Sequence, residues 1–141
     1  WAKGPNAGFS TCQPDKLYFP VATDGGKLTV EAQDEVKSSL LNYTRQLVQL
    51  RHSSKALNNS GDWRMLSSTD QPYPMVYERT SGSERYVVVL NPSAKPATAQ
   101  FPTLGGKAEA VTAVGKASYK SGKQSDTVKA GATSAVIYRI K

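Results

Sequence analysis

One amphipathic segment, Asp34–His52, constrains the fold of this chain more than any other feature. Apolar side chains recur in it every three or four residues, which places them on one stripe of an α-helix. They are Val36, Leu40, Leu41, Tyr43, Leu47, Val48 and Leu50. The stripe covers roughly half of the circumference and is wider than the ~100° typical of a surface helix. This width predicts a helix that packs against two bodies rather than one.

The ends of the segment also suit a helix. Asp34 is the expected N-cap, because its carboxylate can accept hydrogen bonds from the free N–H groups of the first turn. Glu35 stands near the positive end of the helix dipole, and Arg51 and His52 stand near the negative end. We therefore expect one continuous helix from Asp34 to His52.

From Trp63 onward the pattern changes to short strands separated by turn residues. The clearest pair is a hairpin of Met75–Arg79 and Arg85–Leu90, with Gly82 at the bend. Tyr86–Leu90 is apolar on both faces, which predicts a central strand, whereas prolines on either side of Ala97–Phe101 predict an edge strand. Further strands are expected at Trp63–Leu66, Glu109–Val114, Tyr119, Thr127–Val128 and Ala135–Ile140. The expected fold is mainly β: an antiparallel Greek-key β-sandwich preceded by one amphipathic helix and an irregular N-terminal arm.

The arm, residues 1–33, combines glycines and prolines with large apolar side chains. It is too apolar for a disordered tail, so we expect it to lie on a folded surface. Without that surface it would be an exposed adhesive patch, and self-association through the arm and the helix would follow.

Charge and composition restrict the kinds of partner and cofactor. The chain has 18 Lys and Arg and 11 Asp and Glu, for a net charge of +7. The lysines are scattered rather than clustered, so no nucleic-acid partner is expected. No stretch approaches the roughly 20 apolar residues of a membrane span. One cysteine, Cys12, and one histidine, His52, supply neither a disulfide, nor a metal site, nor a nucleophile with its base, and we expect no cofactor.

No pair of acids stands out as a catalytic centre, so we expect no catalytic residue in this chain. Glu78 and Glu84 flank the hairpin beside Arg79 and Arg85, which we interpret as a surface cross-strand charge pattern. The motifs of phosphate-binding loops, nucleophile elbows and zinc proteases are missing from the sequence.

The aromatic residues offer another possible function. Trp1, Trp63, Tyr73 and Tyr119 could stack on sugar rings, and Trp63 with Tyr73 is the pair to test. The competing interpretation, which we favour, is that Trp63 fills the junction between helix and sandwich, because it directly follows the helix exit.

Several segments resemble the α-amylase family, glycoside hydrolase family 13, in the right order along the chain. Trp1–Ser10 resembles a segment that ends there in Asn-Ala-Gly-Phe-Ser, and Val30–Gln33 is similar to a Val-Glu-Ala-Gln before the last barrel helix. Further similar segments are Leu17–Val21, Ser39–Arg51, Ala56–Leu57, Gly61–Asp62, Val76–Arg79 and Val87–Asn91. The variant resembles α-glucosidases, oligo-1,6-glucosidases and trehalose synthases more than endo-acting amylases.

The resemblance implies where the chain divides into two parts and which part of the enzyme carries the catalytic residues. Residues 1–57 would be the arm and last helix of a truncated (β/α)8 barrel, and residues 58–141 the C-terminal β-sandwich. The helix would lie between the barrel and the sandwich, which explains its two apolar partners. The family's retaining mechanism uses carboxylates on barrel strands upstream of the matched segments. No residue here corresponds to them, and only Trp1, Asn6 and Phe9 would lie near substrate.

Three hypotheses follow. The first is a non-catalytic C-terminal fragment of a retaining α-glucoside hydrolase or transglycosylase, which acts on α-glucans or on malto- or isomalto-oligosaccharides; its partner is the barrel. The second is a carbohydrate-binding module with exposed aromatics that contact α-glucan. The third is a standalone interaction domain whose arm and helix pack on another protein. The sequence leaves the compartment open.

Overall fold

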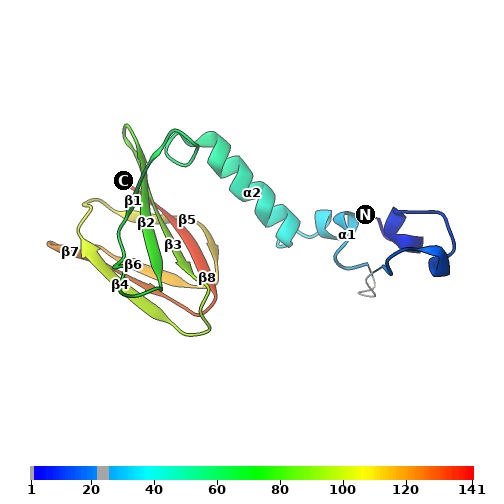
Figure 1. Cartoon of the computed structure of the whole chain (residues 1–141). Coiled ribbons are helices and arrows are strands. Elements are labelled where there is room, and N and C mark those ends of the chain that lie inside the picture. Colours follow the sequence, from blue (N-terminus) through cyan, green and yellow to red (C-terminus); the bar gives the residue numbers. More distant parts are fainter. Residues whose placement is uncertain (1, 22–25) are drawn as a thin grey trace. The chain divides into compact units, whose positions relative to one another are not determined.

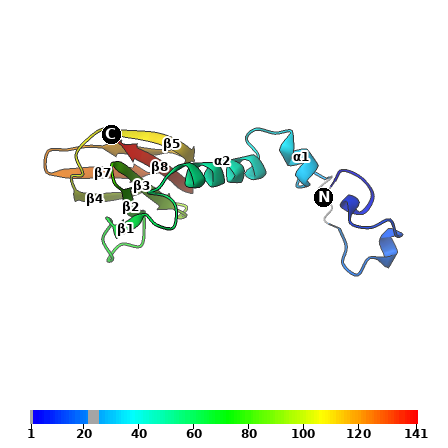
Figure 2. The same cartoon turned by 90° about the horizontal axis from the view of Figure 1, so that it is seen from above.

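The computed structural model describes residues 2–21 and 26–141; Trp1 lies outside them. The chain divides into two compact units, Trp1–Gln49 and Leu50–Lys141. Figure 1 labels their elements, and Figure 2 shows the same chain from above. Among the described residues no helix is long and apolar enough to cross a membrane. The boundary expected between residues 57 and 58 stays a prediction.

The first unit consists of short helices and irregular chain. Its elements are the 3-10 helices η1 (Pro5–Gly8) and η2 (Pro14–Lys16), the helix α1 (Val30–Asp34) and most of α2 (Leu40–Ser53). Lys3 joins the arm to α1: its backbone N–H donates to Glu31 Oε2 at 2.7 Å, and its Nζ lies 2.9 Å from Glu35 Oε2. The hydrogen bond with Glu35 raises the pKa of Lys3. Polar contacts thus hold the arm, as no buried apolar cluster includes its described residues.

The expectation of one helix from Asp34 is wrong, because the segment forms two helices. Asp34 is the last residue of α1, which Thr29 caps, and its carboxylate pairs with Arg45. The N-cap of α2 is Ser39, whose hydroxyl accepts from the N–H of Asn42 at 3.2 Å. The Asn42 side chain in turn donates to the carbonyls of Gln33, Asp34 and Val36, at 3.0 to 3.1 Å. A serine cap and an asparagine that satisfies carbonyls at the end of α1 favour the break.

The second unit is the expected antiparallel β-sandwich. One sheet has the order β1-β2-β3-β8-β5 and the other the order β4-β7-β6. The strands are β1 (Asp62–Met65), β2 (Met75–Ser81), β3 (Glu84–Asn91), β4 (Ala97–Pro102), β5 (Ala108–Val114), β6 (Ala117–Lys120), β7 (Ser125–Ala130) and β8 (Ser134–Ile140). The chain crosses between the two sheets at β3–β4, β4–β5, β5–β6 and β7–β8, as in a Greek-key sandwich.

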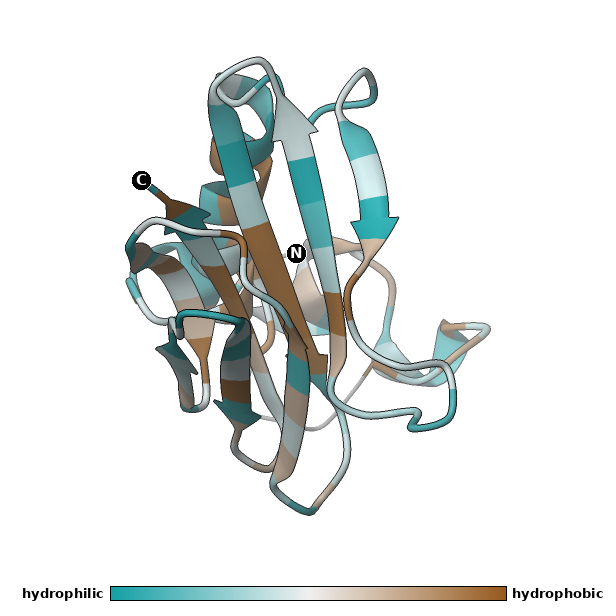
Figure 3. Cartoon of the chain, turned by 90° about the vertical axis from the view of Figure 1, so that its left-hand side faces the viewer, coloured by the Kyte–Doolittle hydropathy of each residue, from teal (hydrophilic) through white to brown (hydrophobic). Residues whose placement is uncertain are grey.

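Positions in the sheets agree with the sequence pattern. Strand β3 lies between β2 and β8, and its apolar run is visible as the brown segment in Figure 3. Strand β4 lies at an edge, as its flanking prolines predict. In the hairpin, Ser81 pairs with Glu84 across Gly82 and Ser83, and Gly82 has the positive φ of 56° that such a tight turn needs.

The sandwich core lies between the two sheets. Its buried apolar members are Val76, Val87, Val89, Ala99, Phe101, Val128, Ala130, Val136, Tyr138 and Ile140. Side chains of alternating residues point into it, so that in β7 Val128 and Ala130 are buried while Lys129 is exposed. A second, smaller cluster lies on the outer face of the five-stranded sheet and joins Ala56 and Leu57 to Tyr86.

Candidate functional site

The predicted substrate-proximal loop is stabilised by one of its own members. Asn6 is 9% exposed, and its amide donates to the carbonyls of Ser10 at 3.0 Å and Cys12 at 2.7 Å. Asn6 and Ala7 both have a φ of 53°, an unfavourable conformation that these two bonds help to maintain. Phe9 is largely exposed, and Cys12 is a free, exposed thiol. Asn6 thus shapes the loop, and a role of the loop near substrate stays a prediction.

The predicted sugar-binding aromatics are found at the surface of the sandwich. Trp63 in β1 is 54% exposed and Tyr73, just before β2, is 43% exposed. The Trp63 ring lies 6.2 Å from that of Tyr77 at an interplanar angle of 38°, so the two rings are tilted rather than coplanar. The interpretation that Trp63 fills the junction between helix and sandwich is therefore wrong.

Tyr119 does not belong to an exposed platform. It is half-buried in the sandwich, where its ring lies 6.0 Å from that of Phe101 and 5.4 Å from that of Tyr138. Its position in β6 directs it inward, between the exposed Ser118 and Lys120.

The junction between the last turn of α2 and the sandwich is made by other residues. Ala56 and Leu57 are buried against Tyr86, with Leu50 and Ile137 at the margin. Gly61 closes the segment, because a Cβ there would lie 2.0 Å from the Ala56 carbonyl oxygen. These apolar contacts fix the residues after the helix to the outer face of the five-stranded sheet.

Glu84 adds a polar link to this junction. Its Oε2 accepts from the Ser54 hydroxyl at 2.6 Å and from the Ala56 N–H at 3.1 Å. The hydrogen bond from Ser54, followed by that from Ala56, lowers the pKa of Glu84. The carboxylate is therefore a structural acceptor rather than a proton donor.

Glu78 is buried, at 5% exposure, so the interpretation of Glu78 as part of a surface charge pattern is wrong. Its Oε2 lies 2.7 Å from Arg64 Nη2 and its Oε1 lies 3.1 Å from Arg85 Nε. The alternation of β2 turns this side chain toward the core together with Val76. A charge pattern in the sequence does not distinguish a buried ion pair from an exposed one.

Asp126 has the burial and the dense hydrogen bonding that are common at functional sites, and the sequence did not indicate it. It is fully buried and accepts four hydrogen bonds: from the Thr103 hydroxyl (2.9 Å), the Leu104 N–H (3.1 Å), the Tyr119 hydroxyl (2.6 Å) and the Gly122 N–H (3.1 Å). Burial raises the pKa of Asp126, but the hydrogen bonds, led by that of Tyr119, outweigh burial and hold it below its ordinary value. Burial, and then the bond to Asp126, raises the pKa of Tyr119.

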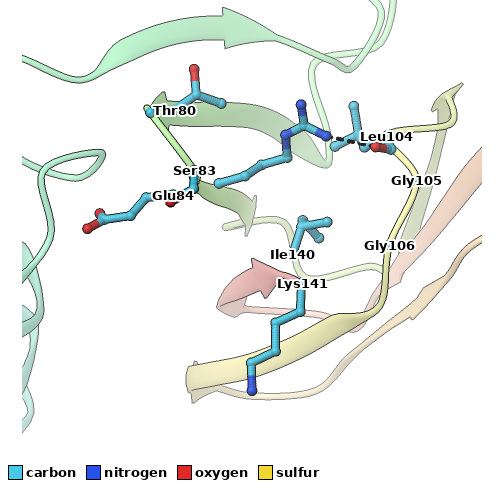
Figure 4. Close-up of a pocket in the computed structure, with 10 residues that line it drawn as sticks. Thr80, Ser83, Glu84, Leu104, Gly105, Gly106, Ile140 and Lys141 are labelled. Atoms are coloured by element: carbon cyan, nitrogen blue, oxygen red, sulfur yellow. Dashed lines mark hydrogen bonds between the residues drawn. The ribbon is translucent and has the colours of Figure 1, made fainter.

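A polar pocket of about 530 Å³ opens beside the hairpin, with Leu104–Gly106 on one side and the end of β8 on another (Figure 4). Its charged groups are engaged with the protein. Arg85 donates to the Leu104 carbonyl at 2.7 Å, Lys141 pairs with Glu109, and the Glu84 side chain extends away from the loop of Leu104. The pocket thus offers no free acid–base pair.

No cluster that could hold a metal ion occurs among residues 2–21 and 26–141. The two buried acids, Glu78 and Asp126, are both held by protein donors. A retaining glycosidase needs two accessible carboxyl groups about 5–5.5 Å apart, one of which must carry a proton. Neither buried acid is placed for that chemistry.

The first unit presents an unusual apolar surface. Its exposed large side chains range from 43% exposure at Val30 to 92% at Tyr18. They are Phe9, Tyr18, Phe19, Leu28, Val30, Val36, Leu40 and Val48. No residue of α2 is buried, although one side of this helix is apolar. Exposed apolar groups gathered in one segment mark an interaction surface.

Comparisons with known proteins agree with this organisation. The chain is 30% identical over 102 residues to the oligo-1,6-glucosidase of Parageobacillus thermoglucosidasius, a match that covers 72% of the chain. It is 40% identical over 60 residues, 40% of the chain, to the trehalose synthase/amylase TreS of Mycobacterium tuberculosis. This chain belongs to the α-amylase family, glycoside hydrolase family 13. It matches the C-terminal part of such enzymes, and no family model matches it.

Solved structures of α-amylase-family enzymes share its fold. An inactive double mutant of MutB, in complex with isomaltulose, superposes with a TM-score of 0.77 at 24% identity over 100% of this chain. The α-amylase from H. orenii superposes with a TM-score of 0.63 at 14% identity over 88%. The chain spans 17% of the oligo-1,6-glucosidase, 10% of TreS and 24% of MutB. It thus corresponds to a small part of each relative.

Proposed function

We propose that this chain is the non-catalytic C-terminal part of a retaining α-glucoside hydrolase or transglycosylase, one that acts on α-glucans or on malto- or isomalto-oligosaccharides. In this proposal the arm and α2 cover one flank of a (β/α)8 barrel, and the sandwich supports the end of α2. The observation that carries it is the exposed apolar surface of the first unit, from Phe9 to Val48.

The size of that surface favours a permanent partner. Complete burial of a large apolar side chain contributes about 1.5–3 kcal/mol. Eight such side chains are exposed in the first unit. The free energy available from covering them is therefore of order 10 kcal/mol, before the costs of association. A surface of this kind suits an obligate contact within one enzyme.

The carboxylates support a catalytic centre outside this chain. Glu78 is buried and paired with Arg64 and Arg85, and Asp126 is buried and accepts four hydrogen bonds. Glu84 accepts hydrogen bonds from the Ser54 hydroxyl and the Ala56 N–H. The proposed barrel supplies the nucleophile and the acid/base of the retaining mechanism. The chain itself requires no cofactor for its proposed role.

Two measurements test the proposal. The first compares hydrolysis of p-nitrophenyl α-glucoside by this chain alone and by a polypeptide in which it follows a (β/α)8 barrel of a relative. Activity is expected only when the barrel is present. Turnover by the chain alone that survives repurification would overturn the proposal.

The second measurement places a charge on the proposed contact. In the barrel-containing enzyme, Leu40→Asp should lower the midpoint of thermal inactivation, because Leu40 lies on the apolar side of α2 and is 75% exposed in this chain. Gln46→Asp, on the polar side of the same helix, is the matched control and should leave the midpoint within a few degrees. Equal midpoints for the two variants would contradict a contact through α2.

Trp63 favours a second candidate function, a carbohydrate-binding module. A half-exposed tryptophan beside Tyr77 and near Tyr73 in sequence could stack on the apolar face of a glucose unit. Affinity electrophoresis in gels that contain amylose distinguishes the two functions. Retardation of the chain that Trp63→Ala abolishes would favour the module, whereas equal mobility with and without amylose would leave the structural role.

A further inference from the structure

The positive charge of the chain is concentrated in the sandwich unit. Thirteen of the 18 Lys and Arg residues, but only six of the 11 Asp and Glu residues, lie in Leu50–Lys141. Residues 1–49 carry equal numbers of basic and acidic side chains. The whole net charge of +7 therefore belongs to one unit, and its distribution there can produce a directional field.

Two of these basic residues, Lys120 and Lys129, lie on the outer face of the three-stranded sheet. The strand register places Lys129 between Thr98 and Ser118, and Thr127 between Gln100 and Lys120. The alternate residues of β7, including Asp126 and Val128, are buried in the core, so this set faces outward. The face is thus a grid of hydroxyl, amide and ammonium groups without an acid.

Further lysines surround this grid at the ends of the sheet. Lys95 precedes β4, Lys116 precedes β6, and Lys123 lies between β6 and β7; all three are exposed. Together with Lys120 and Lys129 they make five, and none of them forms an ion pair with any described residue. The only acid in these strands and in the loops that carry these lysines is Asp126, which is buried.

The composition of this face indicates its kind of partner. Protein–protein interfaces are depleted in Lys and Ser at their centre and enriched in aromatic residues, Met and Arg. Nucleic-acid surfaces use Arg for bidentate phosphate contacts and aromatic rings for stacking. This face has no arginine, and the two aromatic residues of its strands, Phe101 and Tyr119, are turned toward the core and do not belong to it. Lysines on an exposed sheet face are suited to a partner whose negative charge is spread over its surface.

We propose that the outer face of β4-β7-β6 is an electrostatic docking face for a bilayer that contains anionic phospholipids. The five lysines lie against the headgroup phosphates and carboxylates, and the threonines, serine and glutamine can donate hydrogen bonds to phosphate oxygens. The face belongs to the three-stranded sheet, whereas the junction residues Ala56 and Leu57 pack against Tyr86 of the five-stranded sheet. The proposal uses no residue of the first unit and does not rest on the proposed function.

The strength of such binding follows from the number of lysines. Each lysine close to an anionic surface strengthens binding about fivefold, and the attraction falls off within a Debye length of about 10 Å at 0.1 M salt. Removal of two lysines from the face should therefore weaken binding about 25-fold. Removal of two lysines elsewhere should change it by less than about threefold.

Co-sedimentation of the full chain with vesicles tests the proposal. The vesicles contain phosphatidylcholine with about one third phosphatidylserine, and pure phosphatidylcholine vesicles measure adsorption by the apolar arm. The variant Lys120→Gln/Lys129→Gln is compared with Lys37→Gln/Lys55→Gln, which removes the same charge from exposed sites outside the face. The expected result is salt-sensitive binding to anionic vesicles that only the first variant loses.

Three outcomes would overturn it. Equal losses for the two variants would show that net charge alone governs binding. Equal binding to neutral and anionic vesicles would assign it to the apolar arm. Unchanged vesicle binding by the first variant, with weakened binding to a DNA duplex, would assign the face to nucleic acid instead.

Discussion

Replacement of Asp126 by asparagine should destabilise the sandwich far more than the loss of one charge would suggest. The side chain is fully buried, and each of its oxygens accepts two hydrogen bonds. Oδ1 accepts from the Thr103 hydroxyl and the Gly122 N–H. Oδ2 accepts from the Tyr119 hydroxyl and the Leu104 N–H. One donor of each pair is a hydroxyl and the other is a backbone amide.

An asparagine cannot satisfy these donors in either orientation. Its NH2 group would replace one of the two oxygens and would then face a backbone N–H, from Gly122 or from Leu104. A hydroxyl can rotate to accept a hydrogen bond, but a backbone N–H can only donate. One buried donor is therefore left without an acceptor whichever way the amide is turned.

The magnitude follows from two costs. A buried unsatisfied donor costs about 1–3 kcal/mol, and the bonds that remain lose the charge assistance of the carboxylate, which makes such bonds worth about 1.5–3 kcal/mol each. Their sum is about 3–5 kcal/mol in the free energy of unfolding. For a domain of this size each kcal/mol lowers Tm by about 4–8 °C. Urea and thermal unfolding of both proteins measure the difference.

The pH dependence provides a separate check. The pKa of Asp126 in the folded chain is below its ordinary value, so its stabilising contribution is complete above the unfolded pKa of about 4 and is lost as pH falls further. The difference between wild type and Asp126→Asn should therefore shrink below pH 4. Asp62→Asn, at an exposed acid of β1, should stay within about 0.5 kcal/mol. If the difference in unfolding free energy between wild type and Asp126→Asn were equal at pH 7 and pH 3, the conclusion that Asp126 is a buried carboxylate would be refuted.

Three further predictions concern other parts of the chain. Tyr119→Phe should reduce the loss of unfolding free energy above pH 10. The raised pKa of Tyr119 contributes stability that is present below its unfolded pKa of about 10 and is lost as pH rises. Urea unfolding at pH 8 and pH 11 measures this loss, and an equal loss in both proteins would count against the prediction. Leu57→Ala should cost about 2–4 kcal/mol, since Leu57 is 8% exposed in the junction cluster, and a cost under 0.5 kcal/mol would mean that the junction is open in solution. The chain alone should self-associate at micromolar concentration in sedimentation velocity, and Leu40→Asp, but not Gln46→Asp, should shift it toward the monomer; a monomer at every concentration would remove the basis for an adhesive arm.

The strands could be predicted because a two-residue period and turn residues are local signals. The hairpin with Gly82, the central β3 and the edge strand β4 all follow from such signals. The start of α2 does not follow from local signals, because Asp34 and Ser39 are equally suitable N-cap residues by type. The choice between them depends on where the Asn42 amide finds its acceptors, and these belong to residues up to nine positions earlier.

The buried acids show a different limit. Nothing near Asp126 in the sequence distinguishes it from an exposed acid, because three of its four donors come from Thr103, Leu104 and Tyr119, which only the sandwich brings together. The alternation of β2 could have placed Glu78 in the core beside Val76, but its flanking arginines suggested a surface pattern. Trp63 was misplaced for a related reason: it shares a face of the sheet with Arg79 and Tyr86, but it lies on the edge strand β1 and stays 54% exposed, which its position after the helix does not reveal.

The junction connects sandwich stability to the proposed role of α2. Ser54 and Ala56 bind Glu84 at the start of β3, and Leu50 packs at the margin of the cluster that Tyr86 anchors. The last turn of α2 is therefore attached to the same strand that runs through the core. Under the proposed function, a variant such as Asp126→Asn should lower activity of the barrel-containing enzyme near its new unfolding temperature, although it touches no catalytic group. Full activity after the sandwich has unfolded would show instead that the barrel holds α2 without help.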